Sequence, residues 1–192
     1  MSDSGREAQN VRDRRFQRTR GGLLDAFRDL IFSRGYDAIT VGDIVERANV
    51  GRSTFYEHYE NKDDLLRQSM APIVAALAFA LQSDSATDNL RWVVAHVREN
   101  RRFSTSVMTG EPRRLIVQFV ADGIEERLSA RHRAGTLPFA LVAKTIAEAQ
   151  IGLLIAWLAE DGYAAGERVA EALVAEALVA SSRAIEAAML PP

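Results

Sequence analysis

Apolar residues recur at helical spacing along nearly the whole of this 192-residue chain. In the first such segment they fall on one stripe of a helix. The stripe consists of Phe16, Leu23, Leu24, Phe27, Leu30 and Ile31. No run of residues keeps the apolar–polar alternation of a half-buried strand. The spacing therefore predicts an all-α fold, whose first helix ends where Gly35 supplies a C-terminal cap.

Two short helices are predicted next. Thr40, with Asp43 three residues further on, resembles a capping box and starts a helix that ends near Ala48. Asn49 tolerates the left-handed backbone that a sharp helix-to-helix turn needs. A second short helix is expected over about residues 51–58.

Longer helices follow. Asn61 is the candidate N-cap of the fourth helix, and two aspartates after it favour the positive end of that helix. Pro72 lies inside it and predicts a kink or break near Met70. The helices expected from here on cover about residues 62–81, 89–103, 111–133, 137–160 and 166–188, with turn residues between them.

The composition excludes several kinds of chemical site. The chain has no cysteine, which rules out disulfides, zinc-thiolate sites and cysteine nucleophiles. His58, His96 and His132 never form a ligand pair at helical spacing, so no metal site is predicted. No nucleophile elbow, phosphate loop or cofactor fingerprint is present. We therefore expect neither an enzyme nor a bound cofactor.

The most apolar stretch, residues 140–159, is long enough to suggest a membrane span. It contains Lys144, Glu148 and Gln150, and charges are costly at a bilayer centre. A helix buried in an interface is the better interpretation. Because the N-terminal residues MSDSGREAQN lack the apolar region of a secretory signal, a cytoplasmic location is expected.

Charge is distributed unevenly although the net charge is only −2. Residues 6–20 hold six arginines against Glu7 and Asp13, a net +4, whereas residues 147–192 hold seven acids against Arg168 and Arg183, a net −5. This asymmetry fits a chain whose N-terminal end meets a polyanion. A solvated arginine tail without a partner explains the charge alone equally well.

The strongest indication of function lies in residues 40–62. Two short helices joined by a tight turn form a helix-turn-helix, here assigned to residues 40–59. Its inward positions are Ile44, Ala48, Val50, Phe55 and Tyr59. The first residues of the second helix in such a motif reach base edges in the major groove.

The side chains at those positions suit DNA. Arg52 can make a bidentate contact to guanine, and neighbouring hydroxyls can reach phosphates or base acceptors. His58 and Lys62 are placed to bind phosphate oxygens, and Thr40 adds a hydroxyl at a helix N-terminus suited to anions. The predicted DNA-binding residues are Thr40, Arg52, Ser53, Thr54, Tyr56, His58 and Lys62.

Residues 16–66 resemble the DNA-binding domain of the TetR family of bacterial regulators. The resemblance rests on four runs at fixed spacing. They are FSRGY at residues 32–36, IVERA at 44–48, TFYEHY at 54–59 and NKDDLL at 61–66.

The resemblance implies a three-helix, homeodomain-like helix-turn-helix domain at 16–66 and a C-terminal helical bundle for ligand binding and dimerisation at 67–192. A flexible basic arm at 1–15 precedes them. It further implies a homodimer on a palindromic operator, paired through the helices at about 137–160 and 166–188. A small-molecule inducer would move the fourth helix and release the DNA.

Three positions depart from the family pattern. Asn49 stands where glycine is common, and Gly51 where a polar residue is usual. Glu57 places an acid on the recognition helix, where it either accepts from a cytosine amine or repels phosphate. These departures affect the operator sequence more than DNA binding itself.

Several polar or aromatic residues of the C-terminal part are candidates for lining a ligand pocket. Glu148 and Gln150 stand out because they interrupt an apolar helix, and buried polar groups need partners. A ligand or the second subunit could supply those partners, and ordinary packing remains the alternative for each. The candidate pocket residues are Trp92, His96, Gln118, Asp122, Glu148 and Gln150.

The leading hypothesis is a dimeric, ligand-responsive repressor. The alternative is a constitutive dimeric DNA-binding protein with no inducer pocket. A packed C-terminal core without a cleft of a few hundred Å³ would favour that alternative.

Overall fold

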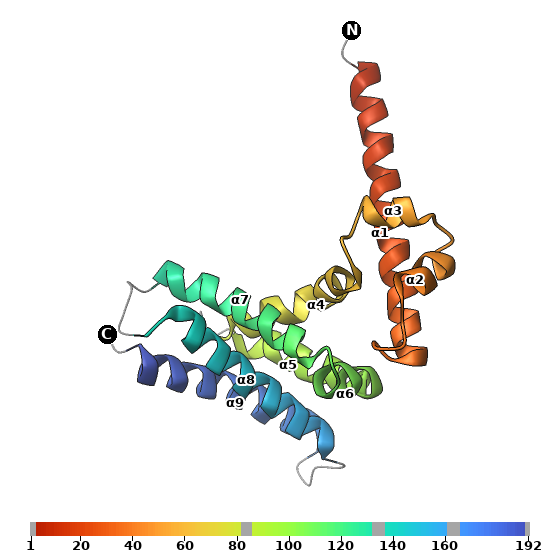
Figure 1. Cartoon of the computed structure of the whole chain (residues 1–192). Helices are drawn as coiled ribbons and strands as arrows, with labels where there is room; N and C mark the ends of the chain where they lie inside the picture. The colour runs from red at the N-terminus through yellow and green to blue at the C-terminus, as the bar shows by residue number, and fades with distance from the viewer. Residues whose placement is uncertain (1–2, 82–85, 132–136, 161–165, 191–192) are drawn as a thin grey trace. The chain divides into compact units, whose positions relative to one another are not determined.

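The computed structural model of the chain describes residues 3–81, 86–131, 137–160 and 166–190, and these residues contain helices and no strand (Figure 1). The predicted all-α fold is confirmed. The chain divides into two compact units, Met1–Ser69 and Met70–Pro192. His132 and the predicted turn at Gly135 lie outside the described residues.

Unit 1 consists of α1 (Asp3–Arg34), α2 (Val41–Arg47), α3 (Arg52–Tyr56) and the first turns of α4 (Lys62–Phe79). Each of these helices contributes apolar side chains to one core. The members that are almost completely buried are Leu23, Phe27, Ile31, Ile39, Ile44, Phe55, Leu65 and Leu66. Burial of each such side chain stabilises the fold by about 1.5–3 kcal/mol, and this fixes the two short helices α2 and α3, which would not persist alone.

Helix α1 begins much earlier than expected, because residues 3–15 continue it where the sequence predicted a flexible arm. Gly21 and Gly22 lie inside α1, and a Cβ at either would meet nothing within 4 Å. The two glycines therefore weaken the helix without ending it. Its C-terminal end is as predicted: Gly35 has φ 79°, and its N–H donates to the carbonyl of Ile31 at 2.9 Å.

Helix α4 continues through Pro72 to Phe79, so the possible break near Met70 does not occur. The predicted N-cap is confirmed, since Asn61 Oδ1 accepts from the backbone N–H groups of Asp63 and Asp64 at 2.9 and 3.1 Å.

Unit 2 contains the end of α4 and five further helices: α5 (Ala86–Glu99), α6 (Arg101–Thr109), α7 (Arg113–Arg131), α8 (Phe139–Ala159) and α9 (Glu167–Met189). Helix α8 packs between α7 and α9, and α9 also packs against α5. The expected separator at residues 104–110 is wrong, because α6 runs through most of it. Val107 and Met108 are buried there, and Thr109 Oγ1 donates to the carbonyl of Thr105 at 2.7 Å.

Helix α8 is long and apolar enough to cross a membrane by length and composition, with mean hydropathy 1.6. Within unit 2 its buried side, including Ile146, Ile151 and Leu154, faces neighbouring helices. Its other side is exposed in the single chain, so the expected burial in an interface stays a prediction.

Candidate nucleic-acid interface

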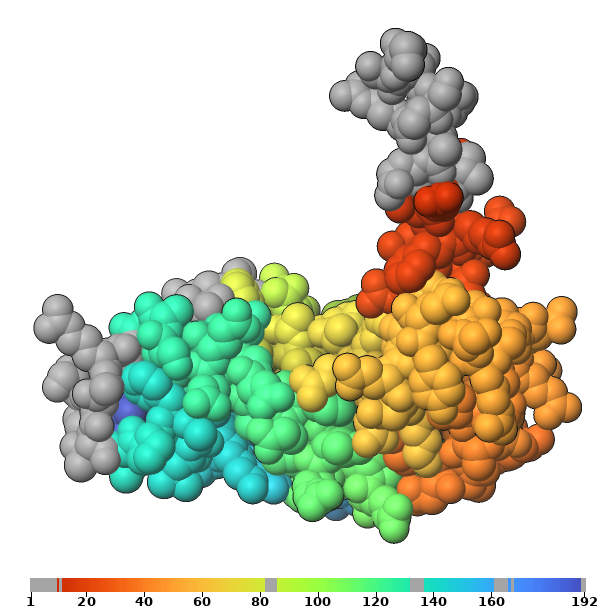
Figure 2. Space-filling view, turned by 45° about the horizontal axis from the view of Figure 1, so that its top comes forward, coloured from red at the N-terminus to blue at the C-terminus, as the bar shows by residue number. Residues whose placement is uncertain are grey.

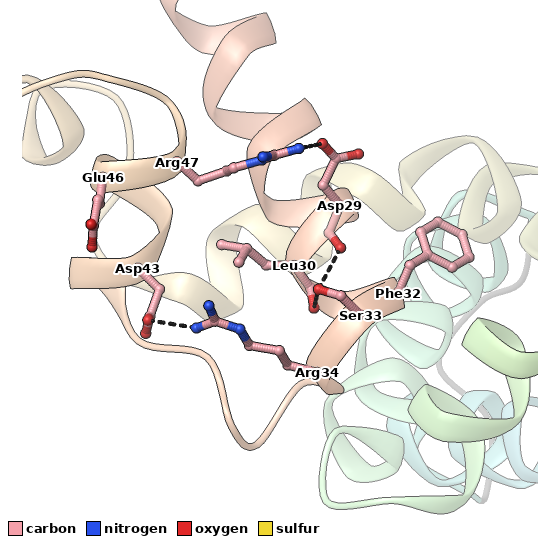
Figure 3. Close-up of a pocket in the computed structure, with 8 residues that line it drawn as sticks. All are labelled: Asp29, Leu30, Phe32, Ser33, Arg34, Asp43, Glu46 and Arg47. Atoms are coloured by element: carbon pink, nitrogen blue, oxygen red, sulfur yellow. Dashed lines mark hydrogen bonds and ion pairs between the residues drawn. The ribbon is translucent and has the colours of Figure 1, made fainter.

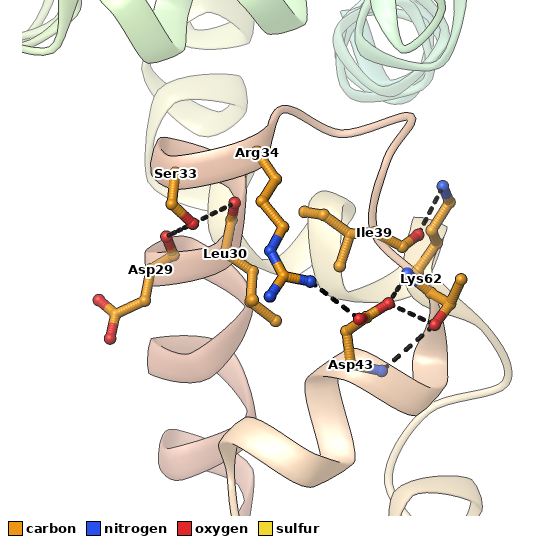
Figure 4. Close-up of polar contacts among 8 residues, drawn as sticks. Asp29, Leu30, Ser33, Arg34, Ile39, Asp43 and Lys62 are labelled. Carbon is orange, nitrogen blue, oxygen red and sulfur yellow. Dashed lines mark hydrogen bonds and ion pairs between the residues drawn. The ribbon is translucent and has the colours of Figure 1, made fainter.

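Helix α2 is held at its start by the predicted capping box. The backbone N–H of Asp43 donates to Thr40 Oγ1 at 3.2 Å, and Asp43 Oδ2 accepts from the N–H of Thr40 at 2.8 Å. Arg34 adds a 3.0 Å ion pair to the same carboxylate (Figure 4). The Thr40 hydroxyl also donates to Asp43 Oδ2, and this bond, followed by the one from the Thr40 backbone N–H, lowers the pKa of Asp43; Arg34 lowers it further. The Thr40 hydroxyl predicted to meet phosphate is therefore already engaged with Asp43.

The turn between α2 and α3 depends on Asn49. It has φ 52°, and it is the single non-glycine residue with a positive φ in the described chain. The N–H of the next residue, Val50, then donates to the carbonyl of Val45 at 3.0 Å and closes the turn. The predicted left-handed conformation of Asn49 is confirmed.

Helix α3 is anchored from one side. Phe55 is fully buried and lies 5.8 Å from the ring of Tyr59, which is also buried. The opposite side carries Arg52 and Ser53, both exposed, and Tyr56, which is 58% exposed. Thr54 is half-buried beside them. The local fold therefore presents three of the predicted DNA-binding side chains to solvent on one short helix.

Arg52 lies against the start of α2. A Cβ added to Gly42 would be 3.2 Å from Arg52 Nη2, so the missing side chain makes room for the guanidinium. Gly51, the N-cap of α3, provides no side-chain cap. It has φ −77°, and a Cβ there would meet only Ser53 and Thr54 at 3.6 and 4.0 Å. Nothing in the local backbone requires glycine at position 51.

Lys62 has a structural role that spacing did not indicate. Its ammonium donates to the carbonyls of Tyr36 and Ile39 at 3.1 and 3.2 Å and lies 4.2 Å from the centre of the Tyr36 ring. The Tyr36 hydroxyl in turn donates to Asp63, and burial followed by this bond raises the pKa of Tyr36. Lys62 thus ties the loop before α2 to the start of α4, and phosphate binding would have to use its remaining N–H.

His58 is half-buried rather than free to meet phosphate. Its ring centre lies 4.0 Å from that of Phe16 on α1, and its Nδ1 is buried without a hydrogen-bond partner. Desolvation lowers the pKa of His58; Glu57 opposes the shift and Arg20 adds to it. The neutral imidazole is therefore favoured, which removes the charge that the predicted phosphate contact relied on.

Basic side chains line the exposed first half of α1. Residues 12–18 are all exposed and include Arg12, Arg14, Arg15 and Arg18. This part of α1 projects from the rest of the unit (Figure 2), which it contacts through Phe16 and His58. Arg20, by contrast, turns inward and donates to Gln68 Oε1 at 3.1 Å. Four cations on one helix form a surface suited to a polyanion, which we call the α1 arginine surface.

A hollow of unit 1 with a volume of about 700 Å³ lies between α1 and α2 (Figure 3). Its two arginines are already paired: Arg34 with Asp43 at 3.0 Å, and Arg47 with Asp29 at 2.6 Å. Because their charges are neutralised within the unit, this hollow is a poor site for an anion.

The six candidate pocket residues are spread over three helices of unit 2. On α5, the Trp92 and His96 rings stack at 5.1 Å; on α7, Gln118 donates to Asp122 at 2.7 Å. On α8, the hydrogen-bond partners of Glu148 and Gln150 are other groups of the protein. Arg113 Nη2 donates to Glu148 at 2.5 Å, and Gln150 Nε2 donates to the carbonyl of Leu77 and to Ser182 Oγ at 3.0 and 2.9 Å.

A cavity of about 360 Å³ in unit 2 includes Trp92, alone of the six, in its lining. Another of about 250 Å³, between α6 and α8, includes none of them. The structure therefore does not bring the six residues together around either space. Arg127, which lines the larger cavity, was missed because an arginine on a polar helix face carries no distinctive sequence signal.

Known proteins resemble the chain mainly in the region of this helix-turn-helix. The family described as "Bacterial regulatory proteins, tetR family" matches residues 23–68. The uncharacterized HTH-type transcriptional regulator YxbF of Bacillus subtilis (strain 168) is 41% identical over 80 residues, which are 39% of this chain and 21% of YxbF. The HTH-type dhaKLM operon transcriptional activator DhaS of Lactococcus lactis subsp. lactis (strain IL1403) is 44% identical over 44 residues, 23% of this chain and 24% of DhaS.

The match thus spans about a quarter or less of the length of these two curated relatives. A solved structure extends the similarity to the remainder of the fold. The TetR transcriptional regulator from Streptococcus agalactiae 2603V has a TM-score of 0.56 at 24% sequence identity and covers 91% of this chain and 98% of that chain. The chain therefore shares the helical fold of that regulator over both units.

Proposed function

We propose that this protein is a DNA-binding transcriptional regulator that acts as a repressor, since residues 23–68 match the family described as bacterial regulatory proteins, tetR family. The observation that carries the proposal is the exposed side of α3. Phe55 holds the helix in the core, while Arg52, Ser53 and Tyr56 face solvent. A helix presented in this way can enter the major groove and place its first residues on base edges.

The test compares two exposed aromatic residues in a mobility-shift titration on the DNA upstream of the protein's own gene. Tyr56→Ala is expected to abolish the shift, because Tyr56 lies on the proposed DNA-facing side of α3. Phe32→Ala, which removes an exposed aromatic from α1, is the matched control and is expected to bind like wild type. Equal binding by both variants would show that α3 does not read this DNA.

Lys62→Ala separates a contact with DNA from a contact within the fold. Its ammonium is held by two backbone carbonyls, so its removal is expected to lower the free energy of unfolding by about 1 kcal/mol. A loss of DNA affinity without any loss of stability in urea titration would instead assign Lys62 to phosphate binding alone.

The proposed assembly is a homodimer through α8 and α9. Both helices have an exposed side of apolar and small residues within unit 2. It includes Leu141, Gly152 and Ala156 on α8 and Val169, Leu173, Ala177 and Ala180 on α9. A second copy would cover these side chains, and a two-fold pair of recognition helices would match a palindromic operator.

We also propose that a small molecule releases the DNA. The cavities of about 360 and 250 Å³ in unit 2 support this version over a constitutive DNA-binding dimer, which needs no cleft of this size.

The proposed sign of regulation is repression, because a regulator that occupies an operator blocks transcription sterically. The name of the relative DhaS, by contrast, describes an activator. Expression of a reporter placed behind the operator, measured with and without the gene for this protein, decides between repression and activation. As a regulator of the bacterial chromosome the protein would act in the cytoplasm, without a catalytic site.

A further inference from the structure

The cavity of about 360 Å³ in unit 2 has walls of unequal character. One wall is the apolar side of α4, with Pro72, Ala75, Ala76 and Phe79. Across from it α5 contributes Asn89 and Trp92, and α7 contributes Arg127. Among the described lining residues there is thus one cation and no acid, so the cavity favours a ligand that combines an apolar body with a negative charge.

Arg127 is only partly satisfied by the protein. Its Nη1 donates to the carbonyl of Gly123 at 2.7 Å, which fixes the direction of the guanidinium. Its Nε is buried and has no hydrogen-bond partner. A buried donor on a charged group is costly when it is left unpaired. A carboxylate beside the guanidinium would compensate its charge, since guanidinium groups bind carboxylates through charge-assisted hydrogen bonds.

Gly123 makes this arrangement possible. A Cβ at position 123 would lie 3.3 Å from Ala78 Cβ and 3.7 Å from Arg127 Nη1. The glycine therefore lets α7 approach α4 closely and leaves Arg127 beside the apolar wall.

Trp92 gives the cavity an aromatic surface. The side chain is 48% exposed although it is large and apolar, and its ring is stacked on His96 with an interplanar angle of 22°. Phe79 is half-buried on the opposite wall. An aromatic ligand would bury these surfaces, and aromatic pairs gain beyond simple burial of area.

We propose that this cavity binds a small aromatic carboxylate, with the carboxylate on Arg127 and the ring between Trp92 and the apolar side of α4. The regulatory consequence rests on the proposed function: α4 begins in unit 1 and ends in unit 2, so a ligand that packs against it in unit 2 would act on a helix shared with unit 1. Binding itself does not depend on DNA.

The test is isothermal titration calorimetry of the full chain without DNA, with 2-naphthoate as the probe and its neutral analogue 2-naphthamide as the ligand control. We expect saturable binding of 2-naphthoate and binding of the amide that is weaker by about ten- to a hundredfold, since the charged hydrogen bonds are absent. Equal affinity for the two compounds, or no binding of either, overturns the proposal.

Variants assign the site. Arg127→Gln is expected to lose the preference for the carboxylate, and Arg127→Lys to keep part of it. Arg114→Gln, an exposed arginine of the same helix, is the matched control and should bind like wild type. Trp92→Phe should remove the ligand-induced change in tryptophan fluorescence. A weakening by Arg114→Gln as large as that by Arg127→Gln contradicts the assignment, and thermal unfolding checks that each variant is folded.

A mobility shift with and without 2-naphthoate separates the two proposals. If the ligand binds but DNA affinity stays constant, the ligand site stands and its regulatory role fails. If DNA is never bound, the regulator proposal fails while calorimetry still decides the ligand site.

Discussion

At the scale of single residues, three side chains near the recognition helix hold that helix in place within unit 1 rather than lying ready to contact DNA. Asn49 adopts the backbone of the turn, Lys62 ties a loop to α4, and His58 fills the space between α3 and α1. The spacing of such residues predicted where they lie in the motif. Their roles depend on neighbours from other helices, which spacing alone does not identify.

Asn49→Ala is expected to lower the free energy of unfolding by about 1 kcal/mol, because φ 52° forces Cβ of an ordinary residue against the following carbonyl. Asn49→Gly is the matched control and should be at least as stable as wild type. Urea titrations of the three proteins measure the difference. A loss of stability in the glycine variant as large as that in the alanine variant would assign the effect to the missing amide instead.

His58 is expected to make unit 1 less stable in mild acid. Since its pKa is lowered from 6.5 in the folded state, the unfolded chain takes up the proton first. The stabilisation is complete above pH 6.5 and is lost as the pH falls toward the folded pKa. His58→Phe keeps the ring contact with Phe16 and should flatten the dependence of stability on pH below pH 7.

Phe16→Ala provides the second variant for that prediction, because it exposes His58 to water and should weaken the same pH dependence. Thermal melts recorded over this pH range report both effects. An unchanged slope in His58→Phe would place the titrating group elsewhere.

At the scale of elements, α1 differs most from what residue spacing predicted. The charge pattern identified its arginines, but not the helix that carries them from Asp3 onward. A helix rises about 1.5 Å per residue, so residues 3–15 add roughly 20 Å of rigid length beyond Phe16. With α3 in the proposed position in the major groove, the α1 arginine surface would reach phosphates that α3 itself does not reach.

Replacement of Arg12 and Arg15 by Gln is expected to weaken binding to all DNA sequences alike. It should also reduce the slope of log K against log [salt] by about 0.9 for each phosphate that the variant no longer neutralises. Arg28→Gln, an exposed arginine near the other end of α1 that pairs with Asp25, is the control. Fluorescence anisotropy at several salt concentrations gives the slope. An unchanged slope would show that the α1 arginine surface is solvated and does not contact DNA phosphates.

At the scale of the whole molecule, the proposed homodimer rests on the exposed side of α8 and α9. Helix α8 buries one side in unit 2 and leaves small residues on the other, which is how a helix accommodates a second helix at close range. The proposed dimer therefore depends on small size at particular positions as much as on apolar area.

Gly152→Leu tests this requirement. Position 152 is exposed, and a Cβ there meets nothing within 4 Å in the single chain. Leucine also favours a helix more than glycine does, so the isolated chain should keep its fold, while the bulk should separate a close partner helix. Analytical ultracentrifugation is expected to show a dimer for wild type and a shift to monomer for the variant. Leu173→Ala, which makes a 57% exposed residue smaller, should weaken the dimer less.

The sequence by itself determined the helical class, the capping box, the turn at Asn49 and the exposed side of the recognition helix. These features depend on local backbone preferences and on periodicity, and both can be read from neighbouring residues. It failed where Ser and Thr side chains suggested a loop at residues 104–110, because burial of Val107 and Met108 outweighs their weak local preference. Only the tertiary structure decided which polar groups are already paired. Lys62, Glu148 and Gln150 find partners far along the chain, and the Nε of Arg127 is left without one.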